Sequence, residues 1–146
     1  MNFSRSLINT FFFIGKIPFA PGTFGSLLTL ILWILIKPSL IVMTLILFMF
    51  FLLSYYTISS ELNETGEKDP QHIVIDEAIG MWISLLTINY HVYAVVLAFI
   101  LFRLLDIFKP SFIFRSQYLK GAWGVLVDDA LAGFITCLIM FGVSSI

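Results

Sequence analysis

The chain has 146 residues, of which 60% are hydrophobic, and its 8 basic residues almost balance its 9 acidic ones. The chain contains sixteen phenylalanines and has a mean hydropathy of +1.02. A small soluble domain cannot bury so many apolar side chains. The composition therefore indicates an integral membrane protein, and the lack of a basic stripe argues against nucleic acid as a partner. The single cysteine, Cys137, excludes an internal disulfide. No linker-like tract divides residues 1–146, so we expect one domain.

The N-terminal half contains two apolar segments that we expect to form membrane helices. Before them, the apolar residues 7–17 resemble the core of a signal peptide, but the following Phe19-Ala20-Pro21 lacks a small-x-small cleavage pattern, so we expect this segment to be retained. Residues 17–36 are uncharged, but prolines and glycines near their start predict a helix beginning near Phe24 and ending at Lys37-Pro38. Residues 40–58 are uncharged and mostly apolar, which meets the length of about 20 residues needed to cross a bilayer.

The second half allows two arrangements. Residues 78–102 are uncharged and could form one long helix, or two short helices over residues 73–88 and 92–107 that turn at Asn89-Tyr90-His91. One continuous helix would separate Asp76 from Asp106 by about 45 Å, whereas a hairpin would bring them together. Residues 123–143 can span the membrane in either case, with Asp128 and Asp129 in the first two turns.

The distribution of basic residues favours the hairpin. Five crossings with the N-terminus inside leave Lys37 as the one basic residue outside, as the positive-inside rule predicts. The fold class we expect is therefore an all-α, polytopic helical bundle with four to five membrane-embedded helices and an acidic cluster at the cytoplasmic side. The remaining basic residues then face the cytoplasm: Arg5, Lys16, Lys68, Arg103, Lys109, Arg115 and Lys120.

Five of the nine acidic residues lie in apolar sequence, where a charge costs about 2.5 to 3.5 kcal/mol even on the milder insertion scales. Such residues are functional candidates, and carboxylates without cysteine or clustered histidine are typical ligands of Mg²⁺. Mg²⁺ in turn suggests phosphoryl chemistry. The predicted metal ligands and catalytic residues are Asp76, Glu77, Asp106, Asp128 and Asp129.

Basic side chains and a glycine-containing turn are candidates for holding a phosphate. Lys68, Arg103 and Lys109 lie near the acidic segments in sequence. The segment 20–26, with Thr23 and Ser26, leads into a helix whose free N–H groups and dipole could seat phosphate, with Thr23 as its cap. A purely structural role for this turn is equally compatible with its residues.

These segments together resemble the phosphatidylglycerophosphatase A family, in the family's order and over about residues 15–135. The shared elements are APGTFGS at 20–26, KDP at 68–70, IVIDE at 73–77 with Gly80, FR at 102–103 with Asp106, KP at 109–110, Gly121, GV at 124–125, DD at 128–129 and AG at 132–133. Each element is weak alone, whereas the set is specific.

The resemblance implies an Mg²⁺-dependent lipid phosphatase of the bacterial inner membrane, with its active site facing the cytoplasm. Its substrate would be phosphatidylglycerophosphate, converted to phosphatidylglycerol and phosphate in glycerophospholipid biosynthesis. The chain departs from the family after Lys109-Pro110, where relatives carry Trp-Pro and then an acidic residue, whereas this chain has Ser111-Phe112 and Gln117. We therefore leave Gln117 out of the predicted site, and weaker Mg²⁺ binding could follow.

Other interpretations compete with this one. A small transporter could use intramembrane carboxylates to carry ions or protons, although it would place them near the midplane and show paired halves. A CDP-alcohol phosphotransferase would use similar metal chemistry, but its spaced Asp pattern on one helix is missing. Simple structural roles are expected for the remaining acids: Asp69 as a helix cap before Pro70, and Glu61, Glu64 and Glu67 as a solvated cytoplasmic face.

Overall fold

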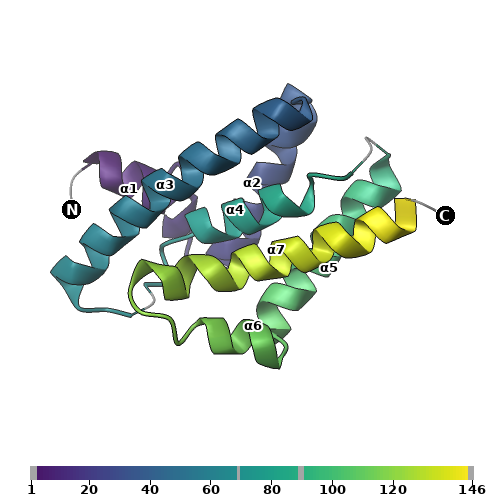
Figure 1. Cartoon of the computed structure of the whole chain (residues 1–146). Coiled ribbons are helices and arrows are strands. Elements are labelled where there is room, and N and C mark those ends of the chain that lie inside the picture. The colour runs from purple at the N-terminus through teal and green to yellow at the C-terminus, as the bar shows by residue number, and fades with distance from the viewer. Residues whose placement is uncertain (1–2, 69, 89–90, 145–146) are drawn as a thin grey trace.

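A computed structural model describes residues 3–68, 70–88 and 91–144, and within these ranges the chain is helical with no strand. Seven α-helices and one short 3-10 helix follow one another, as Figure 1 shows. Their bounds are α1 Phe3–Asn9, η1 Ile14–Lys16, α2 Pro21–Ile36, α3 Leu40–Thr65, α4 Ile75–Ser84, α5 Val92–Phe108, α6 Ser111–Ser116 and α7 Ala122–Ser144. The predicted all-α class is confirmed.

Two helices, α3 and α7, are long and apolar enough to cross a bilayer, compared with the four to five membrane-embedded helices expected. The other apolar helices are shorter: α2 has 16 residues, α5 has 17 and α4 has 10. α2 begins at Pro21, three residues earlier than expected, and so includes Gly22; proline is tolerated there because N–H groups of the first turn have no partner within the helix.

The hairpin, not the single long helix, describes residues 78–102. α4 ends at Ser84 and α5 begins at Val92, and the two helices contact each other while both pack against α7. Of the predicted turn, Asn89 and Tyr90 lie outside the described residues, and His91 precedes α5 directly. This arrangement returns the end of α5 to the start of α4.

α4 and α7 form the most extensive helix contact in the described part of the molecule, because two glycines let their backbones meet. A Cβ on Gly80 would come within 2.5 Å of the Asp129 carbonyl oxygen and 2.6 Å of the Phe102 ring. A Cβ on Gly133 would collide with the carbonyl oxygen of Gly80. Small residues at a helix crossing are typical of membrane proteins, and here they bring Asp129 close to α4.

The outer surface is strongly apolar. In the most hydrophobic stretch of α3 only 22% of the residues are buried inside the structure, against 56% for α7. Exposed side chains of α3 include Leu45, Phe48, Met49, Leu52 and Tyr56. An exposed apolar helix face of this kind is compatible with contact to lipid.

Candidate active site

The five acidic residues in apolar sequence come from three helices and meet at one cavity of about 920 Å³. Asp76 and Glu77 lie in the first turn of α4, Asp106 near the end of α5, and Asp128 and Asp129 near the start of α7. All four aspartates are buried, and Glu77 is half-buried. The hairpin thus brings together carboxylates that are far apart in the sequence.

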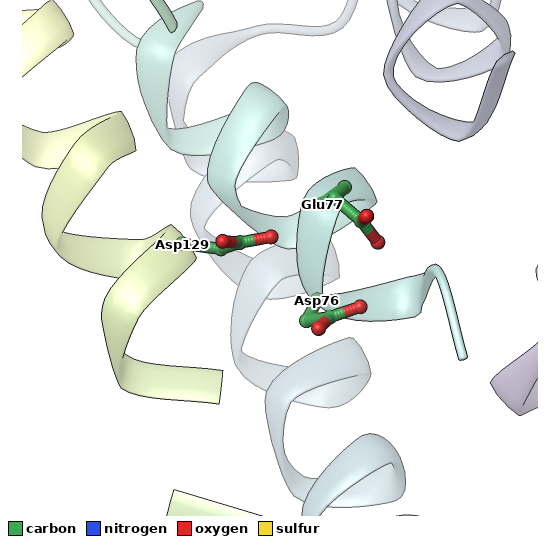
Figure 2. A group of neighbouring side chains, drawn as sticks. All are labelled: Asp76, Glu77 and Asp129. Atoms are coloured by element: carbon green, nitrogen blue, oxygen red, sulfur yellow. The ribbon is translucent and has the colours of Figure 1, made fainter. Parts of the chain in front are cut away.

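One part of this acidic cluster has the geometry of a cation site. Asp76, Glu77 and Asp129 each present an oxygen atom, and these oxygens lie within 4.8 Å of one another (Figure 2). Asp76 Oδ1 and Glu77 Oε2 are buried and have no hydrogen-bond partner in the protein. Burial raises the pKa of Glu77 to about 7, and burial with the charges of Glu77 and Asp129 raises the pKa of Asp76 well above its usual range. Close, unpartnered carboxylates of this kind could hold a cation, whose charge would offset their mutual repulsion.

The other part of the cluster already contains a cation, the ammonium group of Lys109. Its Nζ lies 2.5 Å from Asp128 Oδ2, 3.8 Å from Asp106 Oδ1 and 4.0 Å from Asp129 Oδ1. Burial lowers the pKa of Lys109, but the hydrogen bond to Asp128 and the neighbouring carboxylate charges outweigh it and raise the pKa above its usual value. Lys109 is therefore a fixed positive charge inside the cluster.

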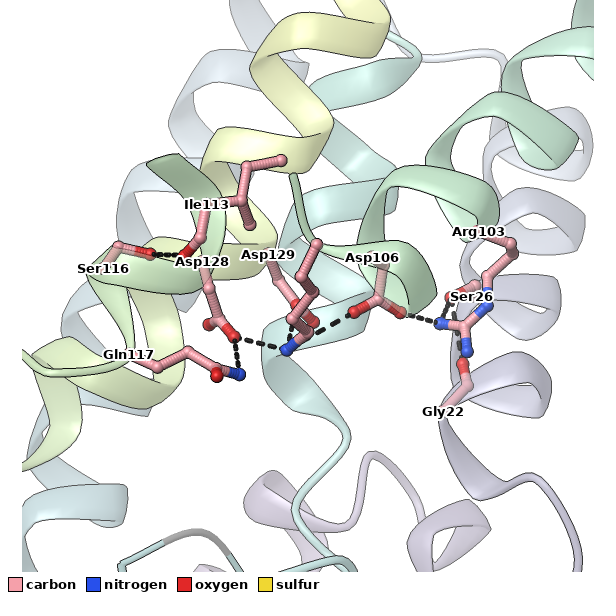
Figure 3. Close-up of polar contacts among 10 residues, drawn as sticks. Gly22, Ser26, Arg103, Asp106, Ile113, Ser116, Gln117, Asp128 and Asp129 are labelled. Atoms are coloured by element: carbon pink, nitrogen blue, oxygen red, sulfur yellow. Dashed lines mark hydrogen bonds and ion pairs between the residues drawn. The ribbon is translucent and has the colours of Figure 1, made fainter. Parts of the chain in front are cut away.

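Arg103 is held between α5 and α2 (Figure 3). Its Nη1 lies 2.6 Å from Asp106 Oδ2 and donates a hydrogen bond of 3.3 Å to Ser26 Oγ. Its Nε is buried without a partner, although the residue lines the cavity. The guanidinium group is thus fixed in place and retains an N–H donor.

The turn before α2 differs from the expected phosphate seat. Ala20, with φ of 47°, occupies the cap position, and no side chain caps the helix, so the expected cap role of Thr23 is wrong. The N–H groups of Thr23 and Phe24 donate to the Ala20 carbonyl oxygen. Because Pro21 has no N–H, few donors remain for a ligand.

The two hydroxyl side chains of this segment lie in different places. Thr23 lines the cavity, whereas Ser26 is fully buried. Ser26 Oγ donates a hydrogen bond to the Gly22 carbonyl oxygen and accepts one from Arg103.

Two further polar residues reach the cavity. Lys68 is exposed and lies at the rim of the cavity. Gln117, which we had left out of the site, donates a hydrogen bond of 3.0 Å to Asp128 Oδ2 (Figure 3). Gly124 allows this contact, because a Cβ there would come within 2.6 Å of the Leu119 carbonyl oxygen in the turn after Gln117. The available signal was the departure from the expected family pattern at Gln117.

Comparison with known proteins agrees with the motifs. The sequence profile described as phosphatidylglycerophosphatase A matches residues 7–144, nearly the whole chain. The chain belongs to the phosphatidylglycerophosphatase A family. A protein of this name in Escherichia coli K12 is 34% identical over 87% of this chain and 76% of its own length. One in Haemophilus influenzae is 35% identical over 88% of this chain and 82% of its own length.

A third relative carries a different name. A Bacteroides thetaiotaomicron protein, named provisionally as a phosphatidylinositol-3-phosphatase, is 35% identical over 95% of this chain and 92% of its own length. No solved structure matches the chain. As a member of the phosphatidylglycerophosphatase A family the chain is a phosphatase, and this membership does not favour the transporter interpretation.

Proposed function

We propose that this phosphatase hydrolyses the phosphate monoester of phosphatidylglycerophosphate with Mg²⁺ as cofactor. The observation that carries the proposal is the trio Asp76, Glu77 and Asp129, whose oxygens converge within 4.8 Å while two of the carboxylates keep a buried oxygen without a partner. An all-oxygen donor set fits Mg²⁺, which prefers carboxylates, water and phosphate as ligands. When bound, Mg²⁺ would neutralise charge on the phosphoryl oxygens and lower the pKa of water.

The protein's own residues would divide the remaining tasks. Arg103, held by Asp106 and Ser26, lines the cavity and would present its guanidinium group to the phosphate, and Lys68 at the rim would attract the phosphate. Glu77, with a pKa of about 7, is our candidate to accept a proton from the attacking water. The oxygen of that water would bond to phosphorus, the bond from phosphorus to the glycerol oxygen would break, and the leaving oxygen would take up a proton.

Lys109 would have a different task from the phosphate binding first predicted for it. Its ammonium group is surrounded by Asp106, Asp128 and Asp129, and its closest contact is Asp128 at 2.5 Å. We therefore assign Lys109 to holding the carboxylates together rather than to gripping the phosphate directly. Asp128 keeps a buried Oδ1 without a partner, which leaves it able to take part in cation binding.

We also propose that the bundle lies in the bacterial inner membrane, with this site at the cytoplasmic side. α2 and α5 would be embedded beside the spanning helices α3 and α7, and the short α4 would be shielded between them. The starts of α4 and α7 and the ends of α3 and α5 lie around the same cavity, which suits one membrane face. In this topology seven of the eight basic residues fall on the cavity side and only Lys37 on the other, which supports the cytoplasmic face.

Phosphatidylinositol phosphate is a second candidate substrate, because the Bacteroides relative is named for that class of lipid. The decisive experiment measures phosphate release by purified protein in detergent from phosphatidylglycerophosphate and from phosphatidylinositol 3-phosphate, with Mg²⁺ and with a chelator. We expect Mg²⁺-dependent release from phosphatidylglycerophosphate at the higher kcat/KM. Faster release from the inositol lipid would reassign the substrate, and equal rates with the chelator would remove the Mg²⁺ proposal.

Replacing Arg103 by methionine should lower kcat/KM by about 100-fold, because a charge-assisted contact to the phosphoryl oxygens is lost. Arg103→Lys should recover only part of this, since lysine cannot reproduce the planar set of donors. Ser26→Ala is the matched control: it removes one contact to Arg103 but leaves the Asp106 pair, and we expect less than a tenfold effect. Steady-state kinetics with phosphatidylglycerophosphate would test this. Wild-type kcat/KM in a folded Arg103→Met protein would contradict the role.

A further inference from the structure

Glu61 does not lie on a solvated face, as we had expected for it together with Glu64 and Glu67. Its side chain is 2% exposed, whereas that of Glu64, one turn further along α3, is 56% exposed and pairs with Arg5. The difference follows from which side of α3 each residue occupies. Burying a carboxylate is costly unless its oxygens are paired, so we expect the oxygens of Glu61 to have partners in the protein.

Both oxygens of Glu61 are used, and each contacts a different segment. Asn9, at the end of α1, donates from Nδ2 to Glu61 Oε2 over 2.6 Å, and Nε2 of His72 lies 2.5 Å from Glu61 Oε1. Asn9 is fully buried. Through these two contacts Glu61 connects α1, α3 and the segment before α4.

The same segments are joined through their backbones. The Val74 N–H donates to the Asn9 carbonyl oxygen over 2.9 Å. Gly15 in η1 packs so closely on the His72 carbonyl oxygen that a Cβ would collide with it. Residues 72–74 are therefore held from three sides immediately before α4 begins at Ile75.

Because Asp76 and Glu77 occupy the first turn of α4, their position depends on the residues that lead into it. We propose that Glu61 is a positioning residue of the active site: it fixes residues 72–74 through Asn9 and His72 and so sets the two α4 carboxylates opposite Asp129. Glu61 itself does not line the cavity, whereas its neighbour Leu62 does. The proposal rests on the proposed function only in taking these carboxylates as cation ligands.

The test compares three variants on α3. Glu61→Leu removes both contacts. Glu61→Gln keeps them in neutral form, since its amide oxygen can accept from Asn9 while its NH₂ group donates to His72 Nε2. Glu64→Leu is the control on the exposed side. Mn²⁺, as a spectroscopic substitute for Mg²⁺, is titrated by electron paramagnetic resonance without substrate, and kcat and KM are measured at fixed, limiting Mg²⁺.

We expect Glu61→Leu to bind Mn²⁺ at least about tenfold more weakly, the size of effect seen when residues that orient metal ligands are removed. Its kcat at limiting Mg²⁺ should fall, with recovery at high Mg²⁺ and little change in KM for lipid. The Mn²⁺ affinity and kcat of Glu61→Gln should stay within about threefold of the wild-type values, and Glu64→Leu should match the wild type. A folded Glu61→Leu protein with wild-type Mn²⁺ affinity and kcat would overturn the proposal.

Two additions keep the test decisive. If Glu61→Leu does not fold, His72→Ala removes one of the two contacts and should show the same loss of Mn²⁺ affinity; wild-type affinity in that variant would overturn the proposal. Hydrogen exchange of residues 72–80, measured without metal, should be faster in the disrupting variants and unchanged in Glu64→Leu. If the wild-type protein binds no Mn²⁺, the cation site fails, whereas faster exchange would still support positioning and unchanged exchange would refute it.

Discussion

Asp76→Asn and Asp129→Asn should each lower phosphate release from phosphatidylglycerophosphate by at least about 100-fold, with the protein still folded. Each change removes one charged ligand from a set of three whose oxygens lie within 4.8 Å of one another. The loss should exceed the 10- to 100-fold effect typical of residues that only orient metal ligands. Because burial and neighbouring carboxylates raise the pKa of Asp76 well above its usual range, neutral asparagine should relieve repulsion and leave stability intact or improved.

The measurement is phosphate release at several Mg²⁺ concentrations, beside the melting temperature in detergent. Glu64→Gln is the control, because Glu64 is an exposed acid whose partner is Arg5 and which lies outside the cavity wall. It should retain wild-type turnover. Wild-type turnover in both aspartate variants would mean that the converging carboxylates do not form the active site.

Gly133→Ala should destabilise the protein by about 1–3 kcal/mol and abolish most activity. The added Cβ would collide with the Gly80 carbonyl oxygen and come within 3.0 Å of the Gly80 Cα, and backbone atoms cannot move aside as a flexible side chain can. α7 would have to separate from α4, which would carry Asp129 away from Asp76 and Glu77. Stability and activity are therefore expected to fall together.

Gly142 provides a matched control on the same helix, since a Cβ there would meet nothing within 4 Å. Gly142→Ala should be neutral or slightly stabilising, because alanine has the higher helix propensity. Thermal unfolding and phosphate release of both variants would test the prediction. If the two alanine variants melt at the same temperature, the close α4–α7 crossing is not what stabilises the bundle.

Much of the architecture followed from simple rules applied to the sequence. The long apolar run beginning at Leu40 identified α3. The predicted end was too early, because the last turns of the helix, up to Thr65, are polar and fall outside the apolar pattern. The asymmetry of basic residues favoured the hairpin, and from the hairpin followed the meeting of Asp76 with Asp106. Charge in apolar sequence is costly, so its position is informative.

The contacts that depend on side-chain packing could not be predicted in this way. Lys109 was expected to hold phosphate, because a sequence does not reveal that three carboxylates already surround it. Glu61 was grouped with Glu64 since both lie in a polar stretch, and only the packing of α1 on α3 separates a buried acid from an exposed one. Gln117 reaches Asp128 through the tight turn before α7, and turn geometry is not evident from composition.

The order of the acidic residues along the chain also bears on how the enzyme is made. The clustered carboxylates lie on three helices, α4, α5 and α7, and α7 is the final helix of the described residues. During synthesis, a polypeptide that has inserted only its first helices lacks Asp128 and Asp129, and with them part of the proposed site. If these carboxylates act as proposed, activity against membrane lipids would begin only when the bundle has closed, and a chain truncated before α7 would be inert towards the bilayer in which it folds.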